Sequence, residues 1–281
     1  MINVLFCGND KVFDGFLTTM LSILKRTTTK EPFTFYIYTM DVSDIKPQYL
    51  SLSDEMASYL DSVAKEYNSE NKVIKIDVLD LYNKEFRNSP NEQCYCSPYT
   101  LLRLFADIVP NMPDKLLYLD CDILFNRDIT LLYNQDVSKV EYAAARDHYG
   151  KYLLNPNYVN AGVLLFNLKK MKETKILEKA RHLIKTKKLV FADQSALIRS
   201  TTSKKMLAQK FNDQKFLHKH TIVRHFSKRL FYLPYPKCKN IKQWDISRVH
   251  KVFHYYVFDD ILYEYIYLKR KFEIEVINNG K

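Results

Sequence analysis

Two acidic residues directly follow an apolar run near the middle of the chain. Leu116 to Leu119 is continuously apolar, Asp120-Cys121-Asp122 comes next, and Ile123-Leu124-Phe125 resumes the apolar character. Such runs are typical of strands that are covered on both faces, as in parallel sheets. Because a carboxylate that leaves water is strongly destabilised unless it is compensated, two acids here indicate a bound cation. Hard divalent cations prefer oxygen ligands, so both acids are candidate metal ligands; a solvated Asp-x-Asp turn is the alternative.

Strands and helices alternate along the first 200 residues. The pattern predicts strands at 4–7, 33–38, 73–76, 116–119, 142–145 and 163–166, and helices at 16–24, 52–67, 98–109 and 168–187. This alternation is typical of the α/β class and predicts a mostly parallel, mixed sheet flanked by helices. In open α/β sheets, ligands bind beyond the carboxyl ends of the strands. Asp120 and Asp122 fall at such an end.

Composition excludes several kinds of protein. The chain has 281 residues, 47% of them hydrophobic, which suffices for one large domain or for a domain with an appendage. Its 5 glycines do not cluster, so neither a Rossmann fingerprint nor a P-loop is present. The 5 cysteines, among them Cys94 and Cys96, lack a repeated metal-ligand spacing and indicate reduced thiols in a cytoplasmic protein. We expect a soluble or peripheral protein, because the sequence shows neither a membrane span nor a signal peptide.

The net charge of +11 belongs to the C-terminal part of the chain. Residues 201–281 carry 17 Lys and Arg against 7 Asp and Glu, together with 15 aromatic residues. This mixture suits an anionic membrane surface, a nucleic acid, or helices that pack on the core. We expect a catalytic domain over 1–235 and a basic aromatic extension over 236–281. The extension would contact the inner face of the membrane peripherally, and nucleic acid is the less favoured partner.

Three further motifs place polar residues at the edges of apolar segments: Asn160-Ala161-Gly162, Asp193-Gln194 and Arg224-His225. Together with Tyr118-Leu119-Asp120-Cys121-Asp122, their order and spacing resemble glycosyltransferase family 8, which includes bacterial lipopolysaccharide galactosyltransferases and glucosyltransferases and the glycogenins. The resemblance covers residues 1 to about 230. It implies the nucleotide-diphospho-sugar transferase (GT-A) fold and a retaining, Mn²⁺-dependent transfer of a hexose. The donor would be UDP-glucose or UDP-galactose, and the acceptor a saccharide or a lipid-linked saccharide.

The resemblance also implies roles for the matched residues. Asp120, Asp122 and His225 would bind Mn²⁺, with Mg²⁺ as the alternative ion; by itself, His225 would be taken for a surface histidine. Asp193 would hold sugar hydroxyls, although an Asp is also a common helix N-cap. The Gln194 amide would lie near the anomeric carbon, and because an amide is a poor nucleophile, a front-face route is favoured over double displacement. The remaining candidates for donor binding are Gly8, Asn9, Asp10, Arg103, Cys121, Asp147, Asn160, Ala161 and Lys228.

The chain departs from the family pattern at two places. Asn9 stands where an Asp commonly contacts the uracil, although an amide can also accept and donate hydrogen bonds. After His225 the family often continues His-x-x-Gly-x-x-Lys-Pro-Trp, whereas Lys228 replaces the glycine here and Lys-Pro-Trp does not follow at that offset. Lys228 or Arg229 is then the expected phosphate-binding cation. Two other function classes stay open: a nucleotide-sugar-binding protein without transfer, and a basic nucleic-acid-binding module.

Overall fold

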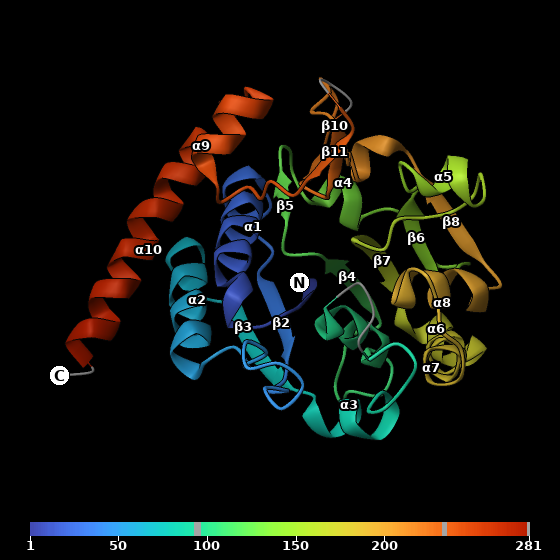
Figure 1. Cartoon of the computed structure of the whole chain (residues 1–281). Coiled ribbons are helices and arrows are strands. Elements are labelled where there is room, and N and C mark those ends of the chain that lie inside the picture. The colour runs from blue at the N-terminus through green and yellow to red at the C-terminus, as the bar shows by residue number, and fades with distance from the viewer. Residues whose placement is uncertain (93–96, 232–234, 280–281) are drawn as a thin grey trace.

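The computed structural model describes residues 1–92, 97–231 and 235–279, so Cys94 and Cys96 lie outside the described residues. A central sheet runs through the molecule, with α1, α2 and α10 on one side and α6, α7 and α8 on the other (Figure 1). Both sides of the sheet are therefore covered by helices, as the sequence predicts.

In the described ranges, seven strands form the central sheet in the order β3-β2-β1-β4-β7-β6-β8. The first four in that order are parallel, β7 is antiparallel to both β4 and β6, and β8 is parallel to β6. The prediction of a mostly parallel, mixed sheet is confirmed. The strand bounds are β1 Ile2–Cys7, β2 Phe33–Thr39, β3 Lys72–Asp77, β4 Lys115–Leu119, β6 Tyr142–Ala145, β7 Val163–Asn167 and β8 Lys204–Leu207.

The apolar core lies in two layers, one on each face of the sheet. Along β4, Leu117 and Leu119 pack into the layer that also holds α1 (Phe13–Arg26) and α2 (Asp54–Tyr67). Leu116 and Tyr118 pack into the opposite layer with α7 and α8 (Ala192–Ser200). Because successive side chains of a strand alternate between the faces, the continuous apolar run of β4 is explained by burial on both.

Two predicted helices were wrong in detail. The segment predicted as a helix over 98–109 forms a 3₁₀ helix, Pro98–Phe105, in which the Arg103 side chain donates to the Thr100 carbonyl. The predicted helix 168–187 is two helices, α6 Leu168–Thr174 and α7 Ile176–Thr186. Lys175 between them has φ 55°, a left-handed conformation that a continuous right-handed helix cannot contain.

Shorter strands and helices lie outside the central sheet and its main helices. β5 (Ile123–Phe125) leaves the central sheet and pairs with β9 (Val223–His225). β10 (Arg229–Phe231) and β11 (Lys237–Lys239) form an antiparallel pair. The remaining helices are α3 Leu79–Glu85, α4 Thr130–Tyr133, α5 Gly150–Leu153, α9 Ile246–Arg248, the 3₁₀ turns Asp10–Val12 and Gln209–Phe211, and the π-helical turn Val249–Phe253.

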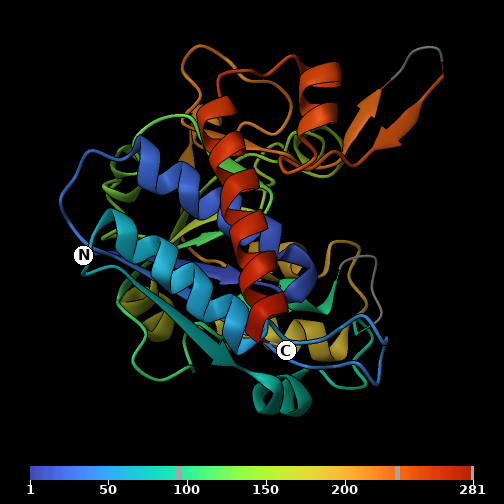
Figure 2. The same ribbon diagram turned by 90° about the vertical axis from the view of Figure 1, so that its left-hand side faces the viewer.

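The last helix, α10 (Asp259–Asn279), runs across α1 and α2 (Figure 2). Its residues Ile261, Leu262 and Leu268 belong to the same apolar layer as α1. Ion pairs join it to α1, with 2.7 Å between Arg26 and Asp260. The division at residue 235 stays a prediction, but the described residues on both sides of it share one core. Among the helices of the described ranges, none combines the length and the apolar character needed to cross a bilayer.

Candidate functional site

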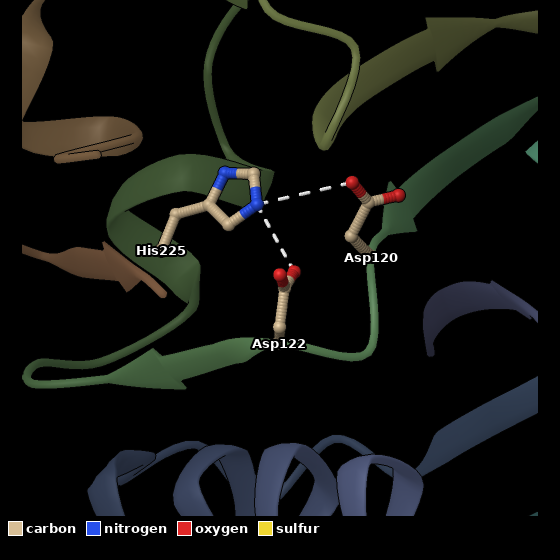
Figure 3. A group of neighbouring side chains, drawn as sticks. All are labelled: Asp120, Asp122 and His225. Atoms are coloured by element: carbon tan, nitrogen blue, oxygen red, sulfur yellow. Dashed lines mark ion pairs between the residues drawn. The ribbon is translucent and has the colours of Figure 1, made fainter. Parts of the chain in front are cut away.

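Asp120, Asp122 and His225 come together beyond the carboxyl end of β4 (Figure 3). Asp120 follows β4 directly, and its backbone N–H donates to the Gly162 carbonyl at 2.8 Å. Asp122 precedes β5, whose antiparallel pairing with β9 sets Ile123 opposite His225. The β5–β9 pair therefore brings a histidine from late in the chain to the two acids, as the resemblance implied.

The three side chains form a compact group of metal-ligand atoms. One ligand atom from each lies within 4.8 Å of the others. Nε2 of His225 is 3.0 Å from Asp122 Oδ1 and 3.8 Å from Asp120 Oδ2. Two carboxylate oxygens and an imidazole nitrogen suit a divalent ion such as Mn²⁺. The donor set therefore fits the implied metal.

Gly162 has no side chain, and the metal-ligand group occupies the space that a side chain would fill. A Cβ on Gly162 would overlap with the Cε1 atom of His225, and it would lie 2.7 Å from Asp120 Oδ2. Ordinary contacts of a Cβ atom begin at about 3.4 Å. The glycine of the Asn160-Ala161-Gly162 motif is thus explained by the close approach of two ligand side chains.

The Asp120 carboxylate is oriented by two donors. Its Oδ1 atom accepts from the Tyr118 hydroxyl at 2.6 Å and from Arg103 Nη2 at 3.1 Å. Its Oδ2 atom is the one that faces His225. Because both donors engage the same oxygen, the other oxygen is directed at the metal-ligand group.

Arg103 connects the metal-ligand group to Asp193. The guanidinium is 3% exposed, lies over the Tyr118 ring, and has its Nε atom 3.2 Å from Asp193 Oδ2. Its Nη1 atom donates to the Ala161 carbonyl. Burial disfavours its charge, but Tyr118, Asp193 and Asp120 together raise the pKa of Arg103 above its ordinary value. Arg103 therefore stays charged and positions two acids, and its direct contact with a donor stays a prediction.

Asp193 and Gln194 lie in the first turn of α8, beside the Asn160-Ala161-Gly162 segment. Gln194 Oε1 accepts from the Ala161 backbone N–H at 2.9 Å. Asp193 is 5% exposed. Burial raises the pKa of Asp193 above its ordinary value, and the charge of Arg103 opposes that change. Both residues are thus brought close to Asp120, although they lie more than seventy residues away in the sequence.

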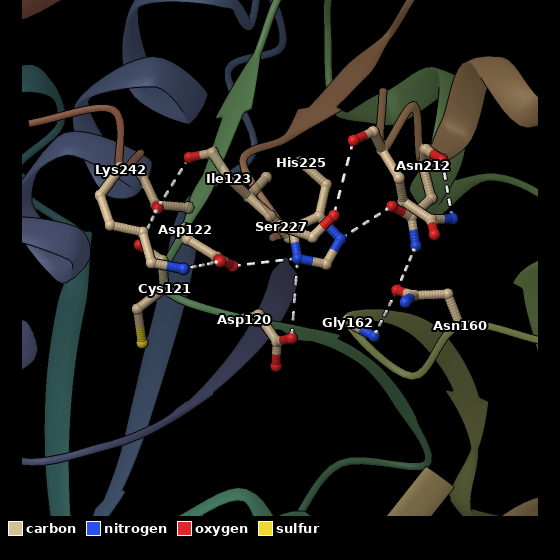
Figure 4. Close-up of polar contacts among 12 residues, drawn as sticks. Asp120, Cys121, Asp122, Ile123, Asn160, Gly162, Asn212, His225, Ser227 and Lys242 are labelled. Atoms are coloured by element: carbon tan, nitrogen blue, oxygen red, sulfur yellow. Dashed lines mark hydrogen bonds and ion pairs between the residues drawn. The ribbon is translucent and has the colours of Figure 1, made fainter. Parts of the chain in front are cut away.

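Asn160 and Asp147 extend the site beyond His225, and Figure 4 shows Asn160 on the side of His225 that faces away from Lys242. Asn160 Nδ2 donates to Asp147 Oδ2 at 2.9 Å. Asn212, which sequence reasoning missed, lies between Asn160 and His225 and hydrogen-bonds with both. A lone Asn thirteen residues before the histidine offers no pattern from which this position could be recognised.

The N-terminal loop lies next to the acid pair because β1 and β4 are parallel neighbours. Cys121 Sγ contacts the Cys7 carbonyl at 3.6 Å. Asn9 is 6% exposed, and its Nδ2 atom donates to the Gln48 carbonyl at 3.2 Å. Asp10 Oδ1 accepts from the Lys11 backbone N–H at 2.7 Å. The loop therefore lies beside the metal-ligand group, and its contact with a uridine donor stays a prediction.

Lys242 is a second residue of the site that sequence reasoning missed. Its ammonium forms an ion pair with Asp122 Oδ2 (Figure 4). The next residue, Gln243, is buried and donates to the Cys121 carbonyl at 2.8 Å, which fixes the segment beside the acids. Burial would raise the pKa of Asp122, but Lys242 and His225 hold it well below its ordinary value.

The signal for Lys242 was present in the sequence. Lys242-Gln243-Trp244 has the Lys-x-Trp pattern that the family places soon after its histidine, and here the β10–β11 pair intervenes. Lys228, the predicted phosphate cation, is exposed next to β10. Because the β10–β11 pair lies between His225 and Lys242, this lysine does not stand at the offset that the family pattern predicts.

Comparisons with known proteins agree with this geometry. The family model described as Glycosyl transferase family 8 matches residues 3–230. A putative glycosyltransferase of Haemophilus influenzae is 28% identical over 190 residues, which are 64% of this chain and 52% of that protein. Glycosyltransferase GlyA of Streptococcus pneumoniae is 38% identical over 97 residues, or 32% of this chain and 14% of GlyA. The chain thus spans about half or less of these curated relatives.

Solved structures of glycosyltransferases share the fold. An active-site mutant of LgtC superposes with a TM-score of 0.68 at 17% identity, over 96% of both chains. The galactosyltransferase LgtC in complex with donor and acceptor sugar analogs gives 0.59 at 18% identity, over 80% of this chain and 86% of LgtC. The glycosyltransferase GlyE of Streptococcus pneumoniae gives 0.58 at 22% identity, over 94% of this chain and 63% of GlyE.

These likenesses confirm the predicted GT-A architecture, with a mixed central sheet between layers of helices. The family model covers most of the chain and includes all three residues of the metal-ligand group. The chain therefore belongs to glycosyltransferase family 8.

Proposed function

We propose that this chain transfers glucose or galactose from a UDP-sugar to a saccharide or lipid-linked saccharide, with retention of configuration. The observation that carries the proposal is the group of Asp120, Asp122 and His225, whose ligand atoms lie within 4.8 Å of one another. The imidazole favours Mn²⁺ over Mg²⁺, which prefers oxygen ligands. A divalent ion held there would neutralise the charge of the departing UDP.

Lys242 supplies the cation for the donor diphosphate in this proposal. Two unit charges 4 Å apart at an effective dielectric constant of 20 interact by about 4 kcal/mol, so a dication beside Asp122 would repel the ammonium strongly. The contact between Lys242 and Asp122 would then give way to a contact with phosphate oxygens. Lys242 takes the role that sequence reasoning gave to Lys228 or Arg229.

Gln194 stabilises positive charge at the anomeric carbon rather than attacking it. Its Oε1 atom is oriented by the Ala161 N–H at 2.9 Å, and an amide lacks the charge of the carboxylate that double displacement uses. We therefore favour a front-face route, in which a phosphate oxygen of the leaving group takes the acceptor proton. Asp193, held by Arg103 at 3.2 Å, would accept hydrogen bonds from sugar hydroxyls. The other proposed donor contacts are Gly8, Asn9, Asp10, Cys121, Asp147, Asn160 and Ala161.

Release of UDP from UDP-glucose and UDP-galactose, measured with Mn²⁺, with Mg²⁺ and with EDTA, tests the proposal. We expect release that depends on the metal and that Asp122→Asn abolishes, while Asp136→Asn, a surface control, leaves it unchanged. A product with inverted configuration would contradict the retaining mechanism. Metal-dependent binding of UDP-sugar without release, in the presence of a saccharide acceptor panel, would support the binding-protein class instead.

We also propose a peripheral contact with anionic membranes through the β10–β11 pair rather than through α10. The helix carries five acidic residues against three basic ones, so acidic side chains outnumber basic ones around its exposed aromatic rings. The β10–β11 region combines exposed Lys237 with Tyr235, which is 67% exposed, and it projects from the molecule (Figure 2). Aromatic rings beside lysines suit an anionic bilayer surface.

Binding to vesicles that contain phosphatidylserine tests the membrane contact. Lys237→Glu with Lys239→Glu should weaken binding at least roughly 30-fold, because each lysine near the surface is worth about 1 kcal/mol. The pair Lys187→Glu and Lys188→Glu, which are exposed on another part of the surface, is the matched control. Equal losses in both pairs would contradict a specific contact, and retardation of RNA without vesicle binding would favour the nucleic-acid class.

A further inference from the structure

Four side chains from separate segments form one continuous hydrogen-bonded row that ends at the metal-ligand group, and Figure 4 shows three of them, His225, Asn212 and Asn160. His225 Nδ1 lies 3.0 Å from Asn212 Oδ1. Asn212 Nδ2 donates to Asn160 Oδ1 at 2.9 Å, and Asn160 Nδ2 donates to Asp147 Oδ2 at 2.9 Å. Asn212 and His225 are 1% and 3% exposed. Water therefore cannot readily replace the partners in the inner part of the row.

The direction of the row is fixed at its outer end. A carboxylate only accepts hydrogen bonds, and Asp147 Oδ1 already accepts from the backbone N–H groups of Tyr149 at 3.0 Å and Gly150 at 2.6 Å. Asp147 Oδ2 must therefore meet the NH₂ group of Asn160. The backbone N–H of Gly162 donates to Asn160 Oδ1 at 3.0 Å. Because a backbone N–H only donates, the Asn160 amide cannot be reversed without losing partners at both ends.

The same argument fixes the orientation of the Asn212 amide and the position of a hydrogen on the His225 ring. Asn160 presents an oxygen to Asn212, so Asn212 must present its NH₂ group there and its oxygen to His225. That oxygen requires a hydrogen on Nδ1 of the ring. Nε2, which lies 3.0 Å from Asp122 Oδ1, is then the ring nitrogen that can give up its hydrogen and bind a metal. A histidine that binds a metal through Nε2 needs this tautomer.

We infer that Asp147 sets the metal-binding tautomer of His225 through Asn160 and Asn212, so that Asp147 and Asn212 are positioning residues of the metal site. The inference rests on the metal site of the proposed function. It also couples two parts of the site, because Asp147 is a proposed donor-sugar contact while His225 is a proposed metal ligand. A change at either end of the row alters hydrogen bonding at the other.

Two isosteric substitutions separate this coupling from a simple loss of charge. Asp147→Asn offers one acceptor oxygen where three donors now bind, so either a backbone N–H or the Asn160 NH₂ group loses its acceptor and the row is held only by Gly162. Asn212→Asp still accepts from His225 Nδ1, but it cannot donate to Asn160. Asn212→Asp therefore keeps the tautomer and cuts the row between His225 and Asp147.

The test is a double-mutant cycle on the full chain with two readouts: Mn²⁺ affinity by calorimetry, and the ¹⁵N signals of the His225 ring in the metal-free protein at alkaline pH. We expect hydrogen on Nδ1 in the wild type and a mixture of tautomers in Asp147→Asn, whose Mn²⁺ affinity falls about 10-fold or more. In the Asn212→Asp background, Asp147→Asn should have no further effect on either readout. Asp44→Asn, an exposed acid paired with Arg87, is the control for lost charge.

The outcomes separate the inference from the function on which it rests. An equal loss of Mn²⁺ affinity from Asp147→Asn in both backgrounds would show a charge effect and overturn the inference. A wild-type ring without hydrogen on Nδ1 would overturn it as well. A wild type that binds no Mn²⁺ would contradict the proposed metal site, and the ring signals, recorded without metal, would still decide whether Asp147 sets the tautomer.

Discussion

Gly162→Ala is the substitution that tests the geometry of the metal-ligand group most narrowly. Gly162 has a negative φ, so alanine meets no backbone strain there. The added Cβ would overlap with His225 Cε1 and lie 2.7 Å from Asp120 Oδ2, where ordinary contact begins at about 3.4 Å. At least one ligand atom must therefore move by roughly 0.7 Å, whereas metal-ligand distances tolerate about 0.2 Å.

The expected loss of Mn²⁺ affinity in Gly162→Ala follows from the free-energy cost of overpacking. Inserting a methyl group into a well-packed place costs about 1–3 kcal/mol. If metal binding requires the wild-type positions, this cost is subtracted from the binding energy. Since each 1.36 kcal/mol is tenfold, Mn²⁺ affinity should fall about 5- to 150-fold. The protein should stay folded, because the metal-free ligands can relax around the methyl group.

Calorimetric titration with Mn²⁺ and thermal unfolding, run on the same samples, measure the two effects. Val163→Ala is the matched control, because it removes a buried side chain one residue away without adding atoms to the ligand group. We expect Val163→Ala to lower the melting temperature and to leave Mn²⁺ affinity nearly unchanged. Gly162→Ala should lower Mn²⁺ affinity and leave the melting temperature nearly unchanged. Unchanged Mn²⁺ affinity in Gly162→Ala would refute the proposed ligand group.

Three further predictions concern other parts of the site and the fold. Lys242→Met should raise the affinity for Mn²⁺ alone several-fold and lower that for UDP, since it removes the cation that pairs with Asp122; parallel changes of both affinities in calorimetry would contradict this. Gln194→Ala should keep partial transfer with a retained product anomer, whereas complete loss of transfer would indicate a nucleophile. Glu141 is buried and accepts from the Thr202 hydroxyl at 2.8 Å; burial opposes its charge, but these hydrogen bonds hold its pKa below the ordinary 4.5. Its stabilising effect is present above pH 4.5 and is lost as the pH falls through the lower folded pKa, so the difference in melting temperature between wild type and Glu141→Gln should shrink from pH 7 to pH 3.5; a constant difference would contradict it.

Local patterns predicted the strands because burial on both faces leaves a continuous apolar run. Leu116 to Leu119 shows this, since its residues divide between the two layers of the core. The break between α6 and α7 could not be predicted in the same way. A single left-handed residue, Lys175 with φ 55°, interrupts an otherwise helical pattern, and lysine gives no local sign of that conformation.

The site was predictable where a motif marks it and not where packing alone brings a residue in. Asp120 and Asp122 are marked by the strand that precedes them, and His225 by the family pattern. Asn212 and Lys242 reach the site through the β5–β9 pairing and through the segment after the β10–β11 pair. Their positions depend on long-range pairing, and only Lys242 carries a local mark, the Lys-x-Trp pattern. The sequence also assigned a basic surface to the C-terminal extension, whereas its last helix, α10, carries more acids than bases.

The most direct test of the central claim is the release of UDP from UDP-glucose or UDP-galactose by the full chain, with and without Mn²⁺. We predict release that requires the metal, that EDTA stops, and that Asp122→Asn removes without loss of folding. Release at an equal rate in EDTA and in Asp122→Asn would contradict the account, because the group of Asp120, Asp122 and His225 would then have no part in the reaction.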